Sequence, residues 1–425
     1  MRIAVSQTQW AVGQGFFHTG AVSRDFPYTR RNPLFTYAYD CGTVSSQRLV
    51  TDEIDECARQ PEHRRELDMV FISHFDKDHV SGIRRLHKRL RPRAYVIPQV
   101  PRLERVFLAA SITVRTRRPP TGEHADLLED PRRWFAGLPG TPRVIEVLPA
   151  NGEGETEPAE LDPLGVPDTF TDPVLLIAQG GPTPSGAVLA TVGPRRRAGD
   201  NMSAEADLWI CVGATMPGSD SDLQAFANDL RSRLGPSVDR MPIRELVREH
   251  WNDLKAAYHA GNAQSRNRTS LCIYSGPPAD VQYHFFHSSS HRRNPGRYGA
   301  VTVPAPGWLG AGDCDLSDPA KVREFVQLFN PVLQHVGVFA VPHHGAARSL
   351  DGSLLGAFAE VPAPGPTCVV GARSTNAHHP SKALRSMLAG PPARLVVASE
   401  DPDSRWVVKS TVEACTTTCP WRTVY

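Results

Sequence analysis

Short apolar runs bounded by turn-forming residues alternate with helical patterns in the first quarter of the chain. Residues 34–40 (LFTYAYD) and 67–73 (LDMVFIS) have the length and composition of buried strands. After the second run, Ile83, Leu86 and Leu90 share one helical face, while arginines fall largely on the other faces. The pattern therefore predicts a strand, a loop and an amphipathic helix, in that order.

The same alternation returns from about residue 267 onward. Apolar runs reading SLCIY, GWLGAGD, VGVFAV and TCVVG predict further strands. Between the second and third of these runs, Asp318 and Pro319 are typical of a helix cap and a first helical position. A strand-rich first half followed by this alternation predicts an α/β sandwich with sheets inside and helices outside.

The middle of the chain has a different composition. Residues 119–206 are rich in proline, glycine and acidic residues, which predicts loops with little buried apolar surface. Two amphipathic helices are expected next, with two sets of apolar residues that each share a face: Leu223, Phe226, Ala227, Leu230 and Leu234, then Ile243, Leu246, Val247, Leu254 and Tyr258. We therefore expect one elaborated domain over residues 1–425, with residues 119–265 as an insertion or lid within it.

Composition excludes several classes of protein. The chain has 425 residues, of which 40% are hydrophobic, and this is ample for a large core. No apolar run reaches the roughly eighteen residues that a membrane-spanning helix needs, and the opening residues lack the pattern of a secretory signal. The eight cysteines are too sparse for a disulfide scaffold. We expect a cytoplasmic protein with reduced thiols and no membrane association.

Two histidines and two aspartates stand close together directly after the apolar run 67–73. His74, Asp76 and Asp78 alternate, so that in an extended loop their side chains turn to the same side, and His79 follows immediately. Imidazole and carboxylate groups are ligands for zinc, manganese or iron. The segment therefore predicts a metal site at the end of a strand.

The order His74-x-Asp76-x-Asp78-His79 resembles the HxHxDH signature of the metallo-β-lactamase superfamily, with Asp76 in place of the second histidine. The HxDxDH form is similar to the hydrolase domain of the ComEC DNA-uptake proteins and of their soluble relatives. Other segments resemble that family in matching order: VGQG at 12–15, DCG at 40–42, Asn267 with SLCI at 270–273, GD at 312–313, PHHG at 342–345 and NAHHP at 376–380. Phe16 stands where the family has an acidic residue after VGQG.

The resemblance implies a four-layer αββα sandwich of metallo-β-lactamase type and a pair of divalent metal ions. It assigns His74 and Asp76 to the first ion and Asp78 and His79 to the second. Asp313 is the carboxylate that bridges the two ions, and His343 of the HHG motif is a further ligand. His344 is the alternative to His343. A third ligand for the first ion has only weak candidates, namely Asn267, His284, His287 and His291. Because Asp76 replaces an imidazole, manganese or magnesium is favoured relative to an all-histidine zinc site.

The resemblance also implies roles in catalysis. Two such cations lower the pKa of a shared water and stabilise the attacking and leaving oxygens. Asp78 is the natural proton acceptor, and His379, directly before Pro380, protonates the leaving group or holds a phosphate. Asp40 orients a metal ligand by hydrogen bonding.

The favoured substrate is a phosphodiester in DNA, RNA or a nucleotide, which makes the protein a nuclease or phosphodiesterase. Arg84, Arg85 and Arg89 follow the metal motif, and the planar guanidinium suits phosphate. The same metal centre is also compatible with a small ester, lactone or amide. A third interpretation is a non-enzymatic sensor or assembly subunit, which the aspartates at 76, 78 and 313 disfavour. The oligomeric state is left open.

Overall fold

The protein is described from a computed structural model, which covers residues 2–25, 33–63, 66–147, 174–179, 188–193, 209–216, 220–260, 269–279, 281–292, 303–347, 349–359, 365–389 and 394–415. Within these residues the strands form two sheets of eight strands each. Both sheets contain parallel and antiparallel pairs. The predicted α/β class is confirmed.

The first sheet has the order β11-β16-β1-β2-β3-β4-β5-β6. Its antiparallel part consists of β11 (Tyr283–Arg292), β16 (Trp406–Ala414), β1 (Arg2–Gln9), β2 (Gly15–Arg24) and β3 (Pro33–Thr43). The parallel part continues from β3 with β4 (Met69–Phe71), β5 (Ala94–Pro98) and β6 (Arg143–Val147). Strands from both ends of the chain therefore lie side by side in one sheet.

The second sheet has the order β15-β14-β13-β12-β10-β9-β8-β7. Its parallel part consists of β15 (Arg394–Ala398), β14 (Thr367–Gly371), β13 (Val336–Ala340) and β12 (Gly307–Gly310). Its antiparallel part continues with β10 (Leu271–Gly276), β9 (Trp209–Thr215), β8 (Val188–Gly193) and β7 (Val174–Gln179). The four apolar runs predicted after residue 267 are the strands β10, β12, β13 and β14.

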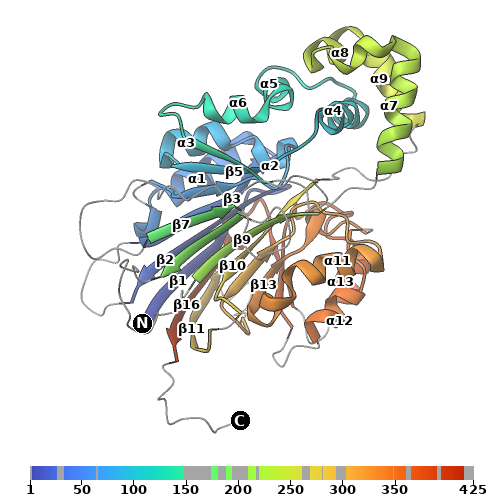
Figure 1. Ribbon diagram of the computed structural model, residues 1–425. Coiled ribbons are helices and arrows are strands. Elements are labelled where there is room, and N and C mark those ends of the chain that lie inside the picture. Colours follow the sequence, from blue (N-terminus) through green and yellow to red (C-terminus); the bar gives the residue numbers. More distant parts are fainter. Residues whose placement is uncertain are drawn as a thin grey trace.

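Three apolar clusters lie between the layers of the molecule. One cluster joins the two sheets, and it contains Val5 and Phe71 of the first sheet with Ile273 and Trp308 of the second. A second cluster packs α1 (Gln47–Cys57), α3 (Ile83–Leu90) and their neighbours on the first sheet. A third packs α11 (Pro319–Phe329), α12 (Ser353–Ala359) and α13 (Lys382–Met387) on the second sheet. Sheets thus lie inside and helices outside (Figure 1).

The helix after Asp318 shows how the local sequence specifies these elements. The Asp318 carboxylate accepts a hydrogen bond from the backbone N–H of Ala320, and Pro319 occupies the first turn, as the cap pattern predicts. Val322, Phe325 and Phe329 are buried in the third cluster. The spacing of these apolar residues therefore explains which face the helix buries.

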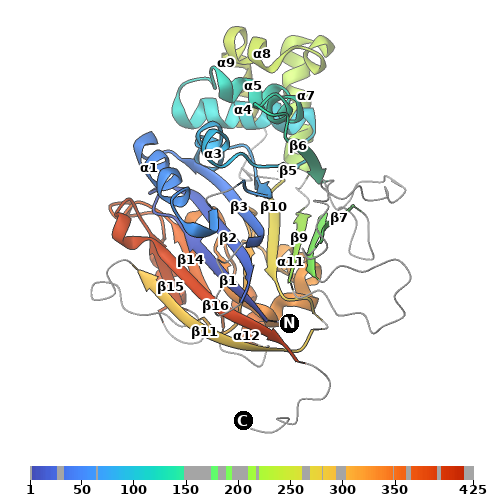
Figure 2. The same ribbon diagram turned by 90° about the vertical axis from the view of Figure 1, so that its left-hand side faces the viewer.

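A group of helices stands at one end of the molecule in both views (Figure 1 and Figure 2). It contains α4 (Arg102–Thr116), α5 (Glu123–Glu129), α6 (Pro131–Ala136), α7 (Asp220–Leu234), α8 (Ile243–Glu249) and α9 (Trp251–Ala260). The apolar residues predicted for its amphipathic helices are buried, except that Leu234 is partly buried. The second of the two expected helices is divided into α8 and α9, which are separated at His250.

The range 119–265, which composition set apart as an insertion, is only partly separate from the two sheets. It supplies β6 to the first sheet and β7, β8 and β9 to the second. The helices α5, α7, α8 and α9 pack on α4, and α6 packs on α5 and β6. Their apolar residues join the same cluster as those of α1 and α3. The helical group is therefore continuous with the core below it.

Candidate metal centre

The segments with metal-ligand residues follow the carboxyl ends of parallel strands. β4 leads into α2 (Lys77–Val80), which carries Asp78 and His79, and β12 leads to Asp313. β13 leads to the HHG segment, and β14 leads to the loop that contains His379. Since such ends meet at one edge of an α/β structure, they form a site from segments far apart in sequence.

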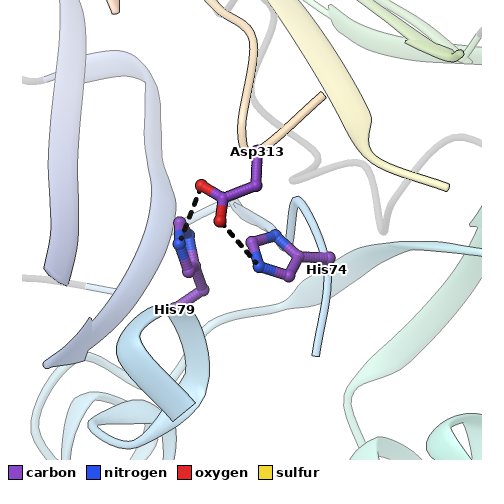
Figure 3. A group of neighbouring side chains, drawn as sticks. All are labelled: His74, His79 and Asp313. Atoms are coloured by element: carbon purple, nitrogen blue, oxygen red, sulfur yellow. Dashed lines mark ion pairs between the residues drawn. The ribbon is translucent and has the colours of Figure 1, made fainter. Parts of the chain in front are cut away.

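Asp313 lies between two histidines. Its Oδ2 is 3.6 Å from Nε2 of His74, and its Oδ1 is 3.3 Å from Nε2 of His79. Figure 3 shows that the carboxylate reaches toward both imidazole rings, which come from the loop after β4 and from α2. All three side chains are buried, and their ligand atoms lie within 4.8 Å of one another.

A second group shares His79 with the first. It consists of Asp78, His79 and His344, and its ligand atoms also lie within 4.8 Å of one another. Nε2 of His344 is 3.3 Å from Oδ2 of Asp78. Two three-residue groups with a common member are an arrangement that can hold one or two cations.

The outer nitrogen of each of these histidines contacts an oxygen atom. Nδ1 of His79 is 2.7 Å from Oδ2 of Asp40, and Nδ1 of His344 is 2.8 Å from the carbonyl oxygen of Gly371. Nδ1 of His74 is 2.9 Å from Oγ of Ser73, whose hydroxyl donates to Asp40. Because a carbonyl, a carboxylate and a hydroxyl that already donates must accept, each Nδ1 carries the proton. In the neutral form that ligates a metal, the Nε2 lone pairs therefore face the aspartates.

The charges of the cluster oppose the effect of burial. Burial raises the pKa of Asp313, but His343, His79 and His74 outweigh it and hold that pKa well below its ordinary value. Burial lowers the pKa of His79, yet the carboxylates of Asp313 and Asp40 raise it well above 6.5. For His74, burial and the neighbouring His79 together lower the pKa. Ionised carboxylates around these rings favour a positive charge at the centre.

Some buried polar atoms at the centre make no hydrogen bond within the described part of the chain. They are Nε2 of His79, Nε2 of His344 and Oδ1 of Asp76. Buried polar atoms in this state are costly unless another partner satisfies them, and a cation is such a partner. Mixed imidazole and carboxylate donors suit zinc or manganese. The residues present therefore fit a divalent cation.

Asp76 has a partner that the sequence did not indicate. Its Oδ2 is 2.9 Å from Nη2 of Arg115, which lies in the last turn of α4. Asp76 is 3% exposed, and it belongs to neither three-residue group. The local sequence around Arg115 contains no motif. Only the packing of α4 beside residues 74–79, which we call the metal loop, reveals the contact.

The two histidines of the HHG segment differ in position. Both have left-handed backbone conformations, with φ of 52° for His343 and 53° for His344. His344 is buried and belongs to the second group, whereas the side chain of His343 is 26% exposed, with Nδ1 3.7 Å from Oδ2 of Asp313. The geometry therefore favours His344, the alternative named above, for the second group and places His343 at the rim.

His379 also lies at the rim. Its ring is stacked against that of His343 with centroids 6.4 Å apart, and it is equally distant from His344. Burial lowers the pKa of His379, and the neighbouring His344 and His343 lower it further. At neutral pH the His379 side chain is therefore uncharged.

The arginines after the metal motif form ion pairs on the outer helices. Arg84 pairs with Glu123 at 2.8 Å, and both Arg85 and Arg89 pair with Asp55 of α1. Their charges are therefore partly neutralised within the protein. Substrate binding by these arginines stays a prediction, and it now requires a substrate that competes with Asp55 and Glu123.

The remaining predicted residues fall in three places. Asp40 holds His79 and Ser73, as expected for a residue that orients a ligand. Asn267 lies outside the described residues. His284, considered as a third ligand, is exposed on β11, at the edge of the first sheet away from β4.

Comparison with family models and with curated proteins found no match for this chain. Among the described residues, no helix is both long enough and apolar enough to cross a membrane.

Proposed function

We propose that this chain is a metal-dependent hydrolase of the metallo-β-lactamase type, with a four-layer αββα sandwich, and that it hydrolyses phosphodiester bonds. The observation that carries the proposal is the orientation of three buried histidines. His74, His79 and His344 each bind an oxygen through Nδ1 and direct Nε2 toward Asp313 or Asp78. Burying so many polar groups costs free energy, and packing alone gives no reason for it. A cation site is therefore the best explanation.

The two groups would hold two divalent cations, zinc or manganese, with His79 and Asp313 near both. His74 and Asp313 would hold one and Asp78 and His344 the other, and His79, which has a single lone pair at Nε2, would ligate only one of the two. Cations in such a site activate water at neutral pH and stabilise negative charge on the substrate.

Two further side chains support hydrolysis. Burial raises the pKa of Asp78, but the nearby imidazole of His344 and the charge of His79 lower it overall, so the side chain is ionised and able to accept a proton. His379, uncharged at neutral pH, would donate a hydrogen bond to a leaving oxygen or a phosphate. Asp78 in the cluster would therefore accept the proton of the attacking water, and His379 at the rim would contact the leaving group.

The choice of phosphodiesters as substrates rests on the HxDxDH resemblance and on Arg115, which contacts Asp76 beside the cluster. The test is a screen of manganese-loaded and zinc-loaded protein against single-stranded DNA, duplex DNA, RNA, cyclic dinucleotides and a neutral aryl ester. Hydrolysis of any nucleic acid or nucleotide that chelation abolishes supports the proposal. Hydrolysis of the ester alone would favour the small-molecule interpretation, and metal binding without hydrolysis would favour a structural role for the metal.

A further inference from the structure

Arg115 reaches the candidate metal centre from the helical group rather than from either sheet. Its Nη2 donates to Oδ2 of Asp76, two residues from His74 in the metal loop. Next to it, His124 of α5 contacts the carbonyl oxygen of Phe75 through Nε2 at 2.8 Å. The α4–α5 segment therefore contacts the metal loop at two consecutive residues, and Arg115 supplies the positive charge there.

Most of the hydrogen-bonding capacity of Arg115 is unused by the residues that the structure describes. A guanidinium has five N–H donors in a planar fork, and Asp76 is the single acceptor of Arg115 within the described residues. The side chain is 33% exposed, while its partner Asp76 is buried. An arginine that is anchored at one edge and open at the other presents a preoriented pair of donors to solvent.

The position of this charge suits an anionic substrate. The carboxylates of Asp76, Asp78 and Asp313 all interact electrostatically with the guanidinium of Arg115. Arg115 adds a fixed positive charge beside the divalent cations of the proposed function, which favours an anionic substrate over a neutral one. In contrast to Arg85 and Arg89, which both pair with Asp55 on α1, Arg115 lies at the carboxylates of the site itself.

We propose that Arg115 is a substrate-binding residue that donates to a non-bridging oxygen of the scissile phosphodiester while Asp76 holds its side chain in place. This inference rests on the proposed function and adds a determinant of specificity to it. A planar, charged fork suits the tetrahedral oxygens of a phosphate diester, whereas a neutral ester gains little from it.

The test compares Arg115→Met and Arg115→Lys with Arg132→Met as a matched control. Arg132 also pairs with a carboxylate, that of Glu146 at 3.5 Å, but its side chain is 71% exposed on α6. Each zinc-loaded or manganese-loaded protein is assayed with bis(p-nitrophenyl) phosphate and with p-nitrophenyl acetate, and its metal content is measured. Loss of one charge-assisted hydrogen bond predicts a fall of about 10- to 100-fold in kcat/KM for the diester with Arg115→Met. Arg115→Lys should retain part of the kcat/KM for the diester that Arg115→Met loses.

The neutral ester, the bound metal and the Arg132→Met control should change little. An equal fall for both substrates, or loss of metal from Arg115→Met, would show that Arg115 only supports Asp76 and would overturn the proposal. If wild-type protein hydrolyses neither substrate, the proposed function fails separately, and calorimetric titration with inorganic phosphate decides the inference. Binding weakened about tenfold by Arg115→Met then supports a phosphate site at Arg115, and unchanged binding refutes it.

Discussion

Asp313 is the side chain on which two histidines converge. Its carboxylate lies between His74 and His79, and its backbone N–H donates to Oγ of Ser270 at the start of β10. The preceding Gly312 has φ of 56°, and a Cβ there would lie 2.4 Å from the same Oγ and 2.7 Å from Cβ of Ser73, which follows β4 of the first sheet. The close approach of the two sheets at this point therefore requires glycine, and it places the carboxylate of Asp313 among the histidines.

Asp313→Asn should remove most of the bound metal and lower turnover by several orders of magnitude without unfolding the protein. The amide keeps the shape of the side chain but not the negative charge that a divalent cation needs. Asp315→Asn is the matched control, because Asp315 pairs with Lys321 and Ser317 instead. Metal content by mass spectrometry and kcat measure the difference. Full metal occupancy in Asp313→Asn would place the site elsewhere.

At the scale of elements, helix α2 packs directly on the end of strand β3. A Cβ on Gly42 would lie 2.6 Å from the carbonyl carbon of Asp78 and 2.6 Å from the nitrogen of His79. The contact is between backbones, so a side chain cannot be accommodated by a simple rotamer change. The glycine of the DCG segment thus sets the distance between the first sheet and the helix that carries two candidate ligands.

Gly42→Ala should therefore destabilise the protein by about 1–3 kcal/mol and weaken metal binding as well. Gly356→Ala in α12 is the control, since nothing lies within 4 Å of a Cβ there and an alanine in a helix is neutral or slightly stabilising. Denaturant unfolding and metal titration give the two quantities. Unchanged metal affinity in a folded Gly42→Ala protein would mean that α2 does not carry ligands.

For the whole molecule, buried histidines link stability to pH. His18 of β2 stacks on Trp308 of the opposite sheet with ring centroids 4.1 Å apart. Burial lowers the pKa of His18 to about 3, and the charge of His63 contributes. Burial lowers the pKa of His63 to about 4, although Glu62 opposes it. Both rings are therefore neutral in the folded protein at pH values where they are protonated in the unfolded chain.

Because the unfolded chain binds more protons below its histidine pKa of 6.5, stability should fall as the pH decreases from 6.5 toward 4. Each histidine contributes a slope of about 1.4 kcal/mol per pH unit in this window. His63→Gln should reduce the slope by that amount, since glutamine does not titrate. Urea unfolding of both proteins at several pH values provides the measurement, and identical slopes would contradict the buried neutral state.

Metal binding should also act on the whole molecule. Purified protein should bind about two divalent ions, and chelation should lower the melting temperature while the circular dichroism spectrum keeps most of its intensity. An ion at a hundred times its Kd adds about 2.7 kcal/mol to the free energy of unfolding. The Asp313→Asn protein serves as a control that should not respond. Equal melting temperatures with and without metal in the wild-type protein would argue against a site formed by both sheets.

The sequence by itself determined the local elements and the metal motif. Periodicity identified α3 and α11, because the apolar face of a helix follows from the residues of that helix alone. The segment 74–79 was apparent because its candidate ligand residues are neighbours in the chain. The fold class followed from the alternation of strands and helices.

Only the tertiary structure decided which distant groups meet. Arg115 and Asp76 are 39 residues apart, and their contact depends on how α4 packs against the metal loop. The adjacent His343 and His344 differ in burial, because His344 packs at Asp78 whereas the side chain of His343 is 26% exposed. The strands of residues 174–215 join the second sheet although their surroundings have the composition of loops. Such contacts arise from packing between segments, which no local pattern records.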